Sequence, residues 1–172
     1  MNLADDDCTL FALPQRYAID LETLDERRRS LLAQTHPDRH AAQGAAAQRV
    51  AMQWSVRINQ AWRRLRDPLQ RAAYLCELGG VPVGLADNTA MPTAFLLQQM
   101  QWRESLADAH DAATVAALAA EVDAVERESL QRLQHQIDDE QDLAAAAATL
   151  RALMFVTRFR GELDRRRDTL GQ

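Results

Sequence analysis

Lysine is absent from this 172-residue chain, in which all twenty basic residues are arginine. Aromatic residues make up only 5% of the sequence, and it has six glycines and five prolines. No apolar run approaches the roughly 20 residues of a membrane span, and the chain starts with aspartates instead of the basic residues of a signal peptide. We therefore expect a helix-rich cytoplasmic protein without a membrane or targeting segment.

Cysteine is also scarce. Cys8 and Cys76 are the two in the sequence, they lie far apart, and neither belongs to a Cys-x-x-Cys motif. This spacing predicts neither a zinc site nor a disulfide framework. We expect two buried, unreactive thiols.

Charge is distributed unevenly along the chain. Residues 16–71 hold eleven arginines and six acidic residues, whereas the remainder holds nine arginines and nineteen acidic residues. A basic half and an acidic half suit two different partners better than one continuous nucleic-acid surface, although a merely solvated surface gives the same pattern.

The first two predicted helices precede residue 36. Asp7 is placed to cap a short helix that runs through Leu13 and stops at Pro14. Asp20 is placed to cap the next helix, whose apolar residues share one arc of the helical wheel. Those residues are Leu21, Leu24, Leu31 and Leu32. Arg28 falls in the same arc, so its side chain must snorkel or lie at the edge.

The pentapeptide His36-Pro37-Asp38-Arg39-His40 separates this helix from the next one. Pro37 disfavours helical dihedrals in the residue before it, so the helix should end near Thr35 or His36. Asp38 can then turn the chain. The sequence predicts a polar, proline-broken tip between two antiparallel helices.

A long third helix follows the tip, and its apolar stripe occupies about a third of the wheel. The stripe comprises Ala47, Val50, Ala51, Trp54, Ile58, Ala61, Trp62 and Leu65. The two tryptophans could stack on nucleic-acid bases, but aromatic residues on such a stripe are usually core. Asp67 and Pro68 then start a short helix through Leu78.

Residues 79–92 are rich in glycine and proline, which indicates a domain boundary. We divide the chain into a first domain at 1–78, a linker at 79–91 and a second domain at 92–172. The second domain reads as three amphipathic helices, at 92–109, from 111 to about 138, and at 142–168. Short connections predict an antiparallel three-helix bundle. No strand pattern is present.

The helix from Pro92 has two apolar faces. Phe95, Trp102 and Leu106 form one face, and Leu96, Leu97 and Met100 form the other, with Gln101, Glu104 and Asp108 around it. A three-helix bundle buries one stripe per helix, so the second face should be exposed and suited to a protein partner. Phe155 or Phe159 could extend it. The alternative is a wide core or packing against the first domain.

Several of these segments together resemble a J domain. They are the His-Pro-Asp triplet, Ile58-Asn59-Gln60-Ala61-Trp62 and Asp67-Pro68-Leu69-Gln70-Arg71-Ala72. With Thr9-Leu10-Phe11-Ala12-Leu13-Pro14 and Thr93-Ala94-Phe95-Leu96-Leu97-Gln98-Gln99-Met100, almost the whole chain resembles the HscB family, the J-type co-chaperones of iron–sulfur cluster assembly.

The resemblance implies an all-α, L-shaped protein made of a J domain and a C-terminal three-helix bundle. It implies two protein partners, an HscA-type DnaK-like ATPase chaperone and an IscU-type iron–sulfur scaffold protein, and no catalytic site, metal or cofactor of its own. The implied chaperone-binding residues are His36, Pro37, Asp38, Arg27, Arg29 and Arg39. The implied scaffold-binding residues are Leu96, Leu97, Met100, Gln101, Glu104 and Phe155.

The chain departs from the family pattern at several positions. Arg39 and His40 replace a usual lysine and aromatic residue, and Arg28 replaces a usual aromatic or apolar one. Ala33 stands at an often basic position, so we expect a thinner docking face, shifted toward Arg27 and Arg29. Gln101 replaces an acid at the scaffold-facing rim.

Two other function classes could use the same residues. A nucleic-acid-binding hairpin would use the arginines at 27–29 and 63–66, but the acidic remainder and the proline-broken tip argue against it. A metal enzyme would use His36 and His40, which Pro37 prevents from sharing one helical turn. We therefore expect neither nucleic acid nor membrane as a partner.

Overall fold

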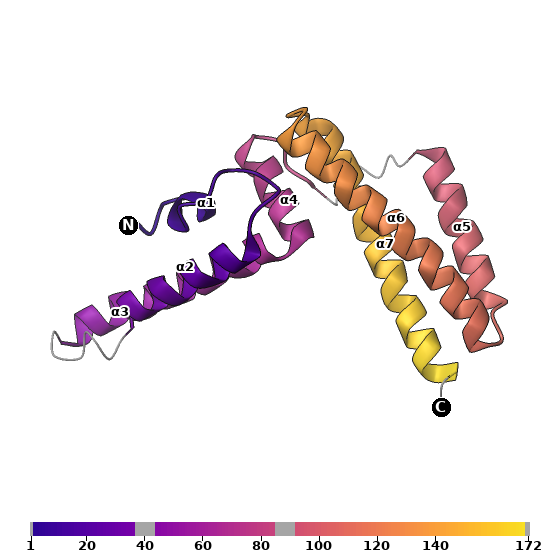
Figure 1. Ribbon diagram of the computed structural model, residues 1–172, viewed down its shortest axis with the longest axis horizontal. Helices are drawn as coiled ribbons and strands as arrows, with labels where there is room; N and C mark the ends of the chain where they lie inside the picture. Colours follow the sequence, from indigo (N-terminus) through magenta and orange to yellow (C-terminus); the bar gives the residue numbers. More distant parts are fainter. Residues whose placement is uncertain (1, 37–43, 85–91, 171–172) are drawn as a thin grey trace. The chain divides into compact units, whose positions relative to one another are not determined.

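The computed structural model describes residues 2–36, 44–84 and 92–170, and each secondary-structure element in these ranges is an α-helix (Figure 1). The helices are α1 (Asp7–Leu10), α2 (Leu21–Gln34), α3 (Ala45–Arg66), α4 (Pro68–Leu78), α5 (Thr93–Ala107), α6 (Ala112–Asp138) and α7 (Leu143–Leu170). The prediction of an all-α protein is confirmed. Within the described ranges, no helix combines the length and apolar character needed to cross a lipid bilayer.

Two compact units divide the chain, Met1–Leu75 and Cys76–Gln172, so α4 begins in the first unit and ends in the second. In the first unit, α2 and α3 lie side by side as an antiparallel hairpin (Figure 1). Leu24 of α2 and Ile58 and Ala61 of α3 are fully buried between the helices of this unit. These are residues of the predicted stripes, so the hairpin follows from helical periodicity.

Two residues of the predicted stripes are exposed. Leu21 is 41% exposed and Val50 is 50% exposed. Leu21 is the first residue of α2, where no preceding turn covers it. Val50 lies at the edge of the α3 stripe, about 80° from Ile58 on a wheel of 100° per residue.

The start of α1 also differs from the prediction. Asp6, not Asp7, caps the helix by accepting a hydrogen bond from the Thr9 amide, and the helix ends at Leu10 instead of Leu13. Asp7 is 1% exposed and forms an ion pair at 2.6 Å with Arg57 of α3. The chain turns early because Ala12 adopts a positive φ of 51°.

In the second unit, α6 and α7 pack along their length as an antiparallel pair (Figure 1). Asp111 caps α6 through the Thr114 amide, and Asp142 caps α7 through the Ala145 amide. The buried residues of the two helices repeat at three- and four-residue spacing, as expected of one stripe each. They are Val115, Leu118, Val122, Leu133 and Ile137 on α6, and Ala146, Ala147, Leu150, Leu153, Val156, Phe159 and Leu163 on α7.

One aromatic residue holds α5 to the other two helices. Trp102 is 2% exposed and stacks on Phe159 of α7, with ring centroids 5.6 Å apart. Its indole N–H donates a 2.7 Å hydrogen bond to a carboxylate oxygen of Glu121 on α6. Because both contacts are on one side of α5, they set the rotation of this helix.

Candidate protein-binding sites

The tip of the α2–α3 hairpin carries the first predicted site. Helix α2 ends at Gln34, with Thr35 as its C-terminal cap, and His36 follows as an exposed residue. The predicted helix end before Pro37 is confirmed. Pro37, Asp38 and Arg39 lie outside the described residues.

Arg27 and Arg29, both predicted to bind the chaperone, have different surroundings. Arg29 is exposed. Arg27 is half-buried, and its Nη1 donates hydrogen bonds to the carbonyl oxygens of Phe11, at 2.6 Å, and Ala12. Arg27 therefore ties α2 to the turn that follows α1. The sequence could not reveal this bond, because it depends on how the early end of α1 presents those carbonyls.

Arg28 lies on the α3 side of α2, where sequence periodicity placed it. Its Nε and Nη2 donate to Asn59 Oδ1 at 3.0 and 2.8 Å, and its guanidinium carbon lies 4.1 Å from the centre of the Trp62 ring. The side chain keeps its charge at the edge of the core by stacking on an aromatic face.

Asp25 joins the two helices beside this stack. It accepts hydrogen bonds of 2.6 Å from Trp62 Nε1 and from Arg66 Nη1, and both donors lower the pKa of its carboxyl, Arg66 more than Trp62. The Arg66 guanidinium also lies 5.2 Å from the Trp62 ring. Trp62 is thus engaged by side chains of its own unit, as expected of a structural residue and not of a base-stacking platform.

The second predicted site lies on the outward face of α5. The side chains of Leu96, Leu97 and Met100 are 46%, 54% and 67% exposed, and Gln101 and Glu104 are exposed beside them. Of the opposite face, Trp102 is buried and Phe95 and Leu106 are half-buried. The two faces derived from the helical wheel are therefore present in the folded unit. We call the outward set, with Phe155, the α5 patch.

The sequence left open whether Phe155 or Phe159 extends the outward face of α5, and the structure distinguishes the two residues. Phe159 is buried under Trp102, whereas Phe155 is 40% exposed. Phe155 lines a shallow groove between α7 and α5 together with Gln99 and Arg103 of α5. On the wheel Gln99 and Arg103 lie between the core face and Leu96, so they connect Phe155 to the rest of the α5 patch. Sequence reasoning missed both residues, although their wheel positions carried the signal.

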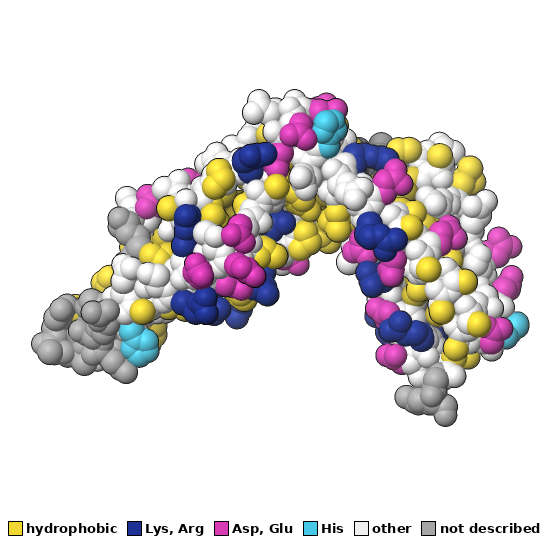
Figure 2. Space-filling model, viewed as in Figure 1, with side chains coloured by type: hydrophobic (Ala, Val, Ile, Leu, Met, Phe, Trp, Pro, Cys, Tyr) yellow, Lys and Arg dark blue, Asp and Glu magenta, His cyan; other side chains and the backbone are white. Residues whose placement is uncertain are grey.

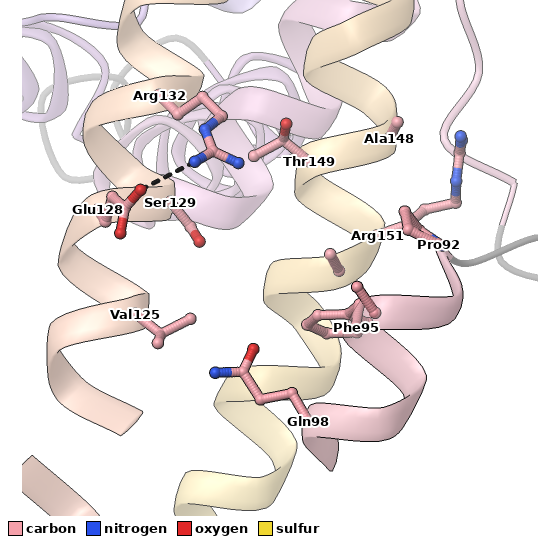
Figure 3. A pocket seen from close by; sticks show the side chains of 12 residues that line it. Pro92, Phe95, Gln98, Val125, Glu128, Ser129, Arg132, Ala148, Thr149 and Arg151 are labelled. Carbon is pink, nitrogen blue, oxygen red and sulfur yellow. Dashed lines mark hydrogen bonds and ion pairs between the residues drawn. The ribbon is translucent and has the colours of Figure 1, made fainter. Parts of the chain in front are cut away.

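A larger cavity of about 480 Å³ lies on the inner side of α5 (Figure 3). Phe95 of α5, Val125 of α6 and Ala148 of α7 supply apolar walls, and the Glu128–Arg132 ion pair, at 2.9 Å, lies on its α6 side. Because Val125 lines the cavity, it is only half-buried. The bundle is closed at Trp102 and open toward the start of α5.

The two cysteine thiols have raised pKa values. Burial is the largest cause that raises the pKa of the Cys8 thiol, which reaches about 11, and burial also raises the pKa of Cys76. Both thiols are buried and unpaired with each other, as predicted. Across the described ranges, no group of three histidine, cysteine or acidic side chains is placed to hold a metal ion.

Comparisons with known proteins agree with this geometry. A family model described as the HSCB C-terminal oligomerisation domain matches residues 91–164. A protein of Bordetella petrii named co-chaperone protein HscB homolog is 50% identical over 161 residues, which are 93% of this chain and 95% of that one.

Solved structures of HscB proteins have the same fold. The chaperone HscB from Vibrio cholerae superposes with a TM-score of 0.82 at 32% identity and covers 96% of this chain and 99% of its own. The human co-chaperone HscB superposes with a TM-score of 0.88 at 22% identity over 95% of this chain and 83% of its own, a likeness of fold alone. By sequence over nearly its whole length, and by the fold of its J-domain and bundle units, the chain belongs to the HscB co-chaperone family.

Proposed function

We propose that this protein is an adaptor between two proteins of iron–sulfur cluster assembly, acting in the cytoplasm and without a catalytic site of its own. The α5 patch binds the IscU-type scaffold protein. The tip of the hairpin and the exposed side of α2 bind the HscA-type chaperone and stimulate its ATPase. A co-chaperone needs only to bind one state of its partner better than another to shift that partner's equilibrium.

The exposure of Leu96, Leu97 and Met100 is the observation that carries the proposal. Exposed apolar side chains within one helical turn, rimmed by Gln101 and Glu104, give an apolar centre with a polar border, the composition of a protein-binding surface. The buried stack of Trp102 on Phe159 supports this assignment, because α5 cannot turn its outward face into the core without breaking that stack.

At the other end, we assign the trigger to His36, Pro37 and Asp38. Asp38 engages an arginine or a backbone amide at the junction between domains of the chaperone. Pro37 fixes the direction of the turn, and His36 orients it. Arg29 and Arg39 supply positive charge toward an acidic chaperone surface. Arg27 contributes by tying α2 to the turn that follows α1.

Replacing Asp38 with asparagine tests the trigger. Asp38→Asn keeps the size of the side chain and removes its charge, so it should abolish ATPase stimulation while leaving scaffold binding unchanged. Full stimulation by this variant would refute the assignment.

The scaffold site is tested by the double variant Leu96→Ala/Phe155→Ala, with titration calorimetry against the scaffold protein. We expect weaker binding, because both side chains lose apolar area at the interface. The matched control is Met52→Ala/Val56→Ala, which truncates two residues of the first unit that are 62% and 52% exposed. Equal affinities of the two double variants would show that the α5 patch does not bind the scaffold.

A further inference from the structure

Helix α3 carries arginines next to α2 in the hairpin, and the inference drawn from them depends on the proposed function of the hairpin. At Ala33, α2 lacks the basic residue that the family often has at this position. Arg27 is hydrogen-bonded to the backbone of Phe11 and Ala12. Of the two arginines expected to compensate, Arg29 remains exposed. Arg27 keeps its charge, because both of its bonds go to neutral carbonyl oxygens, so further exposed charge on the hairpin adds to that of Arg27 and Arg29.

Helix α3, which packs against α2, carries further positive charge. Its residues Ala45–Arg66 include five arginines and no acidic residue. Arg63 is exposed, and the side chain of Arg66 is 47% exposed. Figure 2 shows arginine side chains, in dark blue, along the first unit, with acidic side chains, in magenta, among them.

The indole of Trp62 holds two of the guanidinium groups in place. Arg28 lies 4.1 Å and Arg66 lies 5.2 Å from the ring centre, so the side chains are ordered before any partner arrives. Arg28 donates to Asn59, which is neutral and leaves the charge of Arg28 uncancelled by that bond. Pre-ordered guanidinium groups lose less conformational freedom when they bind carboxylates.

Asp25 sets the net charge of this surface. It pairs with Arg66 at 2.6 Å, and its side chain is 38% exposed. Arg29 is four residues further along α2 and therefore lies on the same side of that helix. A row of charged groups thus runs from Arg29 across Asp25 to Arg66, with Arg63 one turn away on α3.

We propose that Arg29, Arg28, Arg66 and Arg63, arranged around Trp62, form one docking surface for an acidic face of the ATPase chaperone, and that Asp25 weakens this docking by cancelling part of its charge. A clasp that served only to hold α2 against α3 would behave in the opposite way. Removing the charge of Asp25 would then harm the hairpin and reduce docking.

The test is the concentration of the full-length protein that gives half-maximal stimulation of the chaperone ATPase, measured at several salt concentrations. Asp25→Asn retains an oxygen that can accept the Trp62 N–H bond, and it should lower this concentration about threefold at low salt, with the difference vanishing near 1 M salt. Arg63→Ala and Arg66→Ala should each raise it about threefold. Arg127→Ala on α6 removes one exposed charge from the second unit and should change nothing.

The results distinguish failure of the docking surface on α3 from failure of the proposed function on which it depends. Stimulation that is unchanged in Arg63→Ala and Arg66→Ala but reduced in Arg29→Ala would overturn the extension onto α3 and leave docking on α2 intact. Reduced stimulation by Asp25→Asn would also overturn it, in favour of a structural clasp. If Asp38→Asn stimulates fully, the proposed function itself fails.

Discussion

The aromatic rings of Trp102 and Phe159 lie nearly parallel, at an interplanar angle of 13° and a centroid distance of 5.6 Å. This contact between α5 and α7 and the hydrogen bond from Trp102 to Glu121 determine which side of α5 is core. Leu96, Leu97 and Met100 point away from it and remain exposed. The α5 patch is therefore a consequence of bundle packing and not of a loosely held helix.

Truncating a side chain on the core face of α5 should reduce stability more than truncating one on its outward face. Trp102→Ala should lower the free energy of unfolding by about 3–5 kcal/mol, because it empties a buried aromatic site and leaves Glu121 without its indole partner. Leu97→Ala, at a 54% exposed position, should change it by less than about 0.5 kcal/mol. Denaturant unfolding followed by circular dichroism measures both. Similar losses in the two variants would mean that the outward face is buried in solution.

Replacing Asp7 and replacing Asp6 should change the free energy of unfolding by very different amounts. Asp7→Asn should cost about 3 kcal/mol of unfolding free energy, because it leaves Arg57 at the edge of the core without its carboxylate partner. Asp6→Ala removes only a helix cap and should cost about 1 kcal/mol. The pair forms a matched comparison by chemical denaturation. A larger loss for Asp6→Ala would contradict the arrangement of α1 described above.

Acid should weaken the hairpin through Asp25. Hydrogen bonds from Arg66 and Trp62 hold the pKa of this carboxyl below its usual 3.8, so the folded state binds the proton less well than the unfolded state. The contribution of Asp25 to stability is then fully present above pH 3.8 and is lost as the pH falls through the lower, folded pKa. Urea unfolding of the protein and of Asp25→Asn between pH 6 and pH 2 should give stability curves that differ at pH 6 and converge at low pH. Parallel curves would exclude this role.

Cys8 should resist alkylation in the folded protein. Its pKa of about 11 reduces the reactive thiolate at pH 8 about 100-fold relative to a thiol at the usual 9.0, and burial slows the reagent further. Mass spectrometry after iodoacetamide treatment should find Cys8 unmodified in the native protein and fully modified in urea. Rapid native labelling of Cys8 would show that the first unit opens easily.

Helical periodicity predicted most of the fold. The cap of α2 at Asp20, the end of α2 before Pro37, the cap at Asp67 and the two faces of α5 all depend on local chemistry that neighbouring residues determine. What could not be predicted depends on long-range contacts. Three consecutive aspartates offered no local reason for Asp6 to cap α1 while Asp7 paired with Arg57, fifty residues away.

The same limit applies to the sites. The wheel identified Leu96, Leu97 and Met100, because the angular position of a residue on a single helix is a local property. It could not distinguish Arg27 from Arg29, since the difference depends on carbonyl groups of the turn after α1. It also could not show that the Trp62 ring contacts both Arg28 of α2 and Arg66 of its own helix.

The central claim, that one chain joins the scaffold to the chaperone through two separate surfaces, is tested most directly by the rate of ATP hydrolysis by the HscA-type chaperone with and without the IscU-type scaffold. We predict that the protein and scaffold together stimulate more than the sum of their separate effects. Leu96→Ala/Phe155→Ala should retain its own stimulation and lose that synergy, whereas Asp38→Asn should lose both. Undiminished synergy in the Leu96→Ala/Phe155→Ala variant would contradict the account.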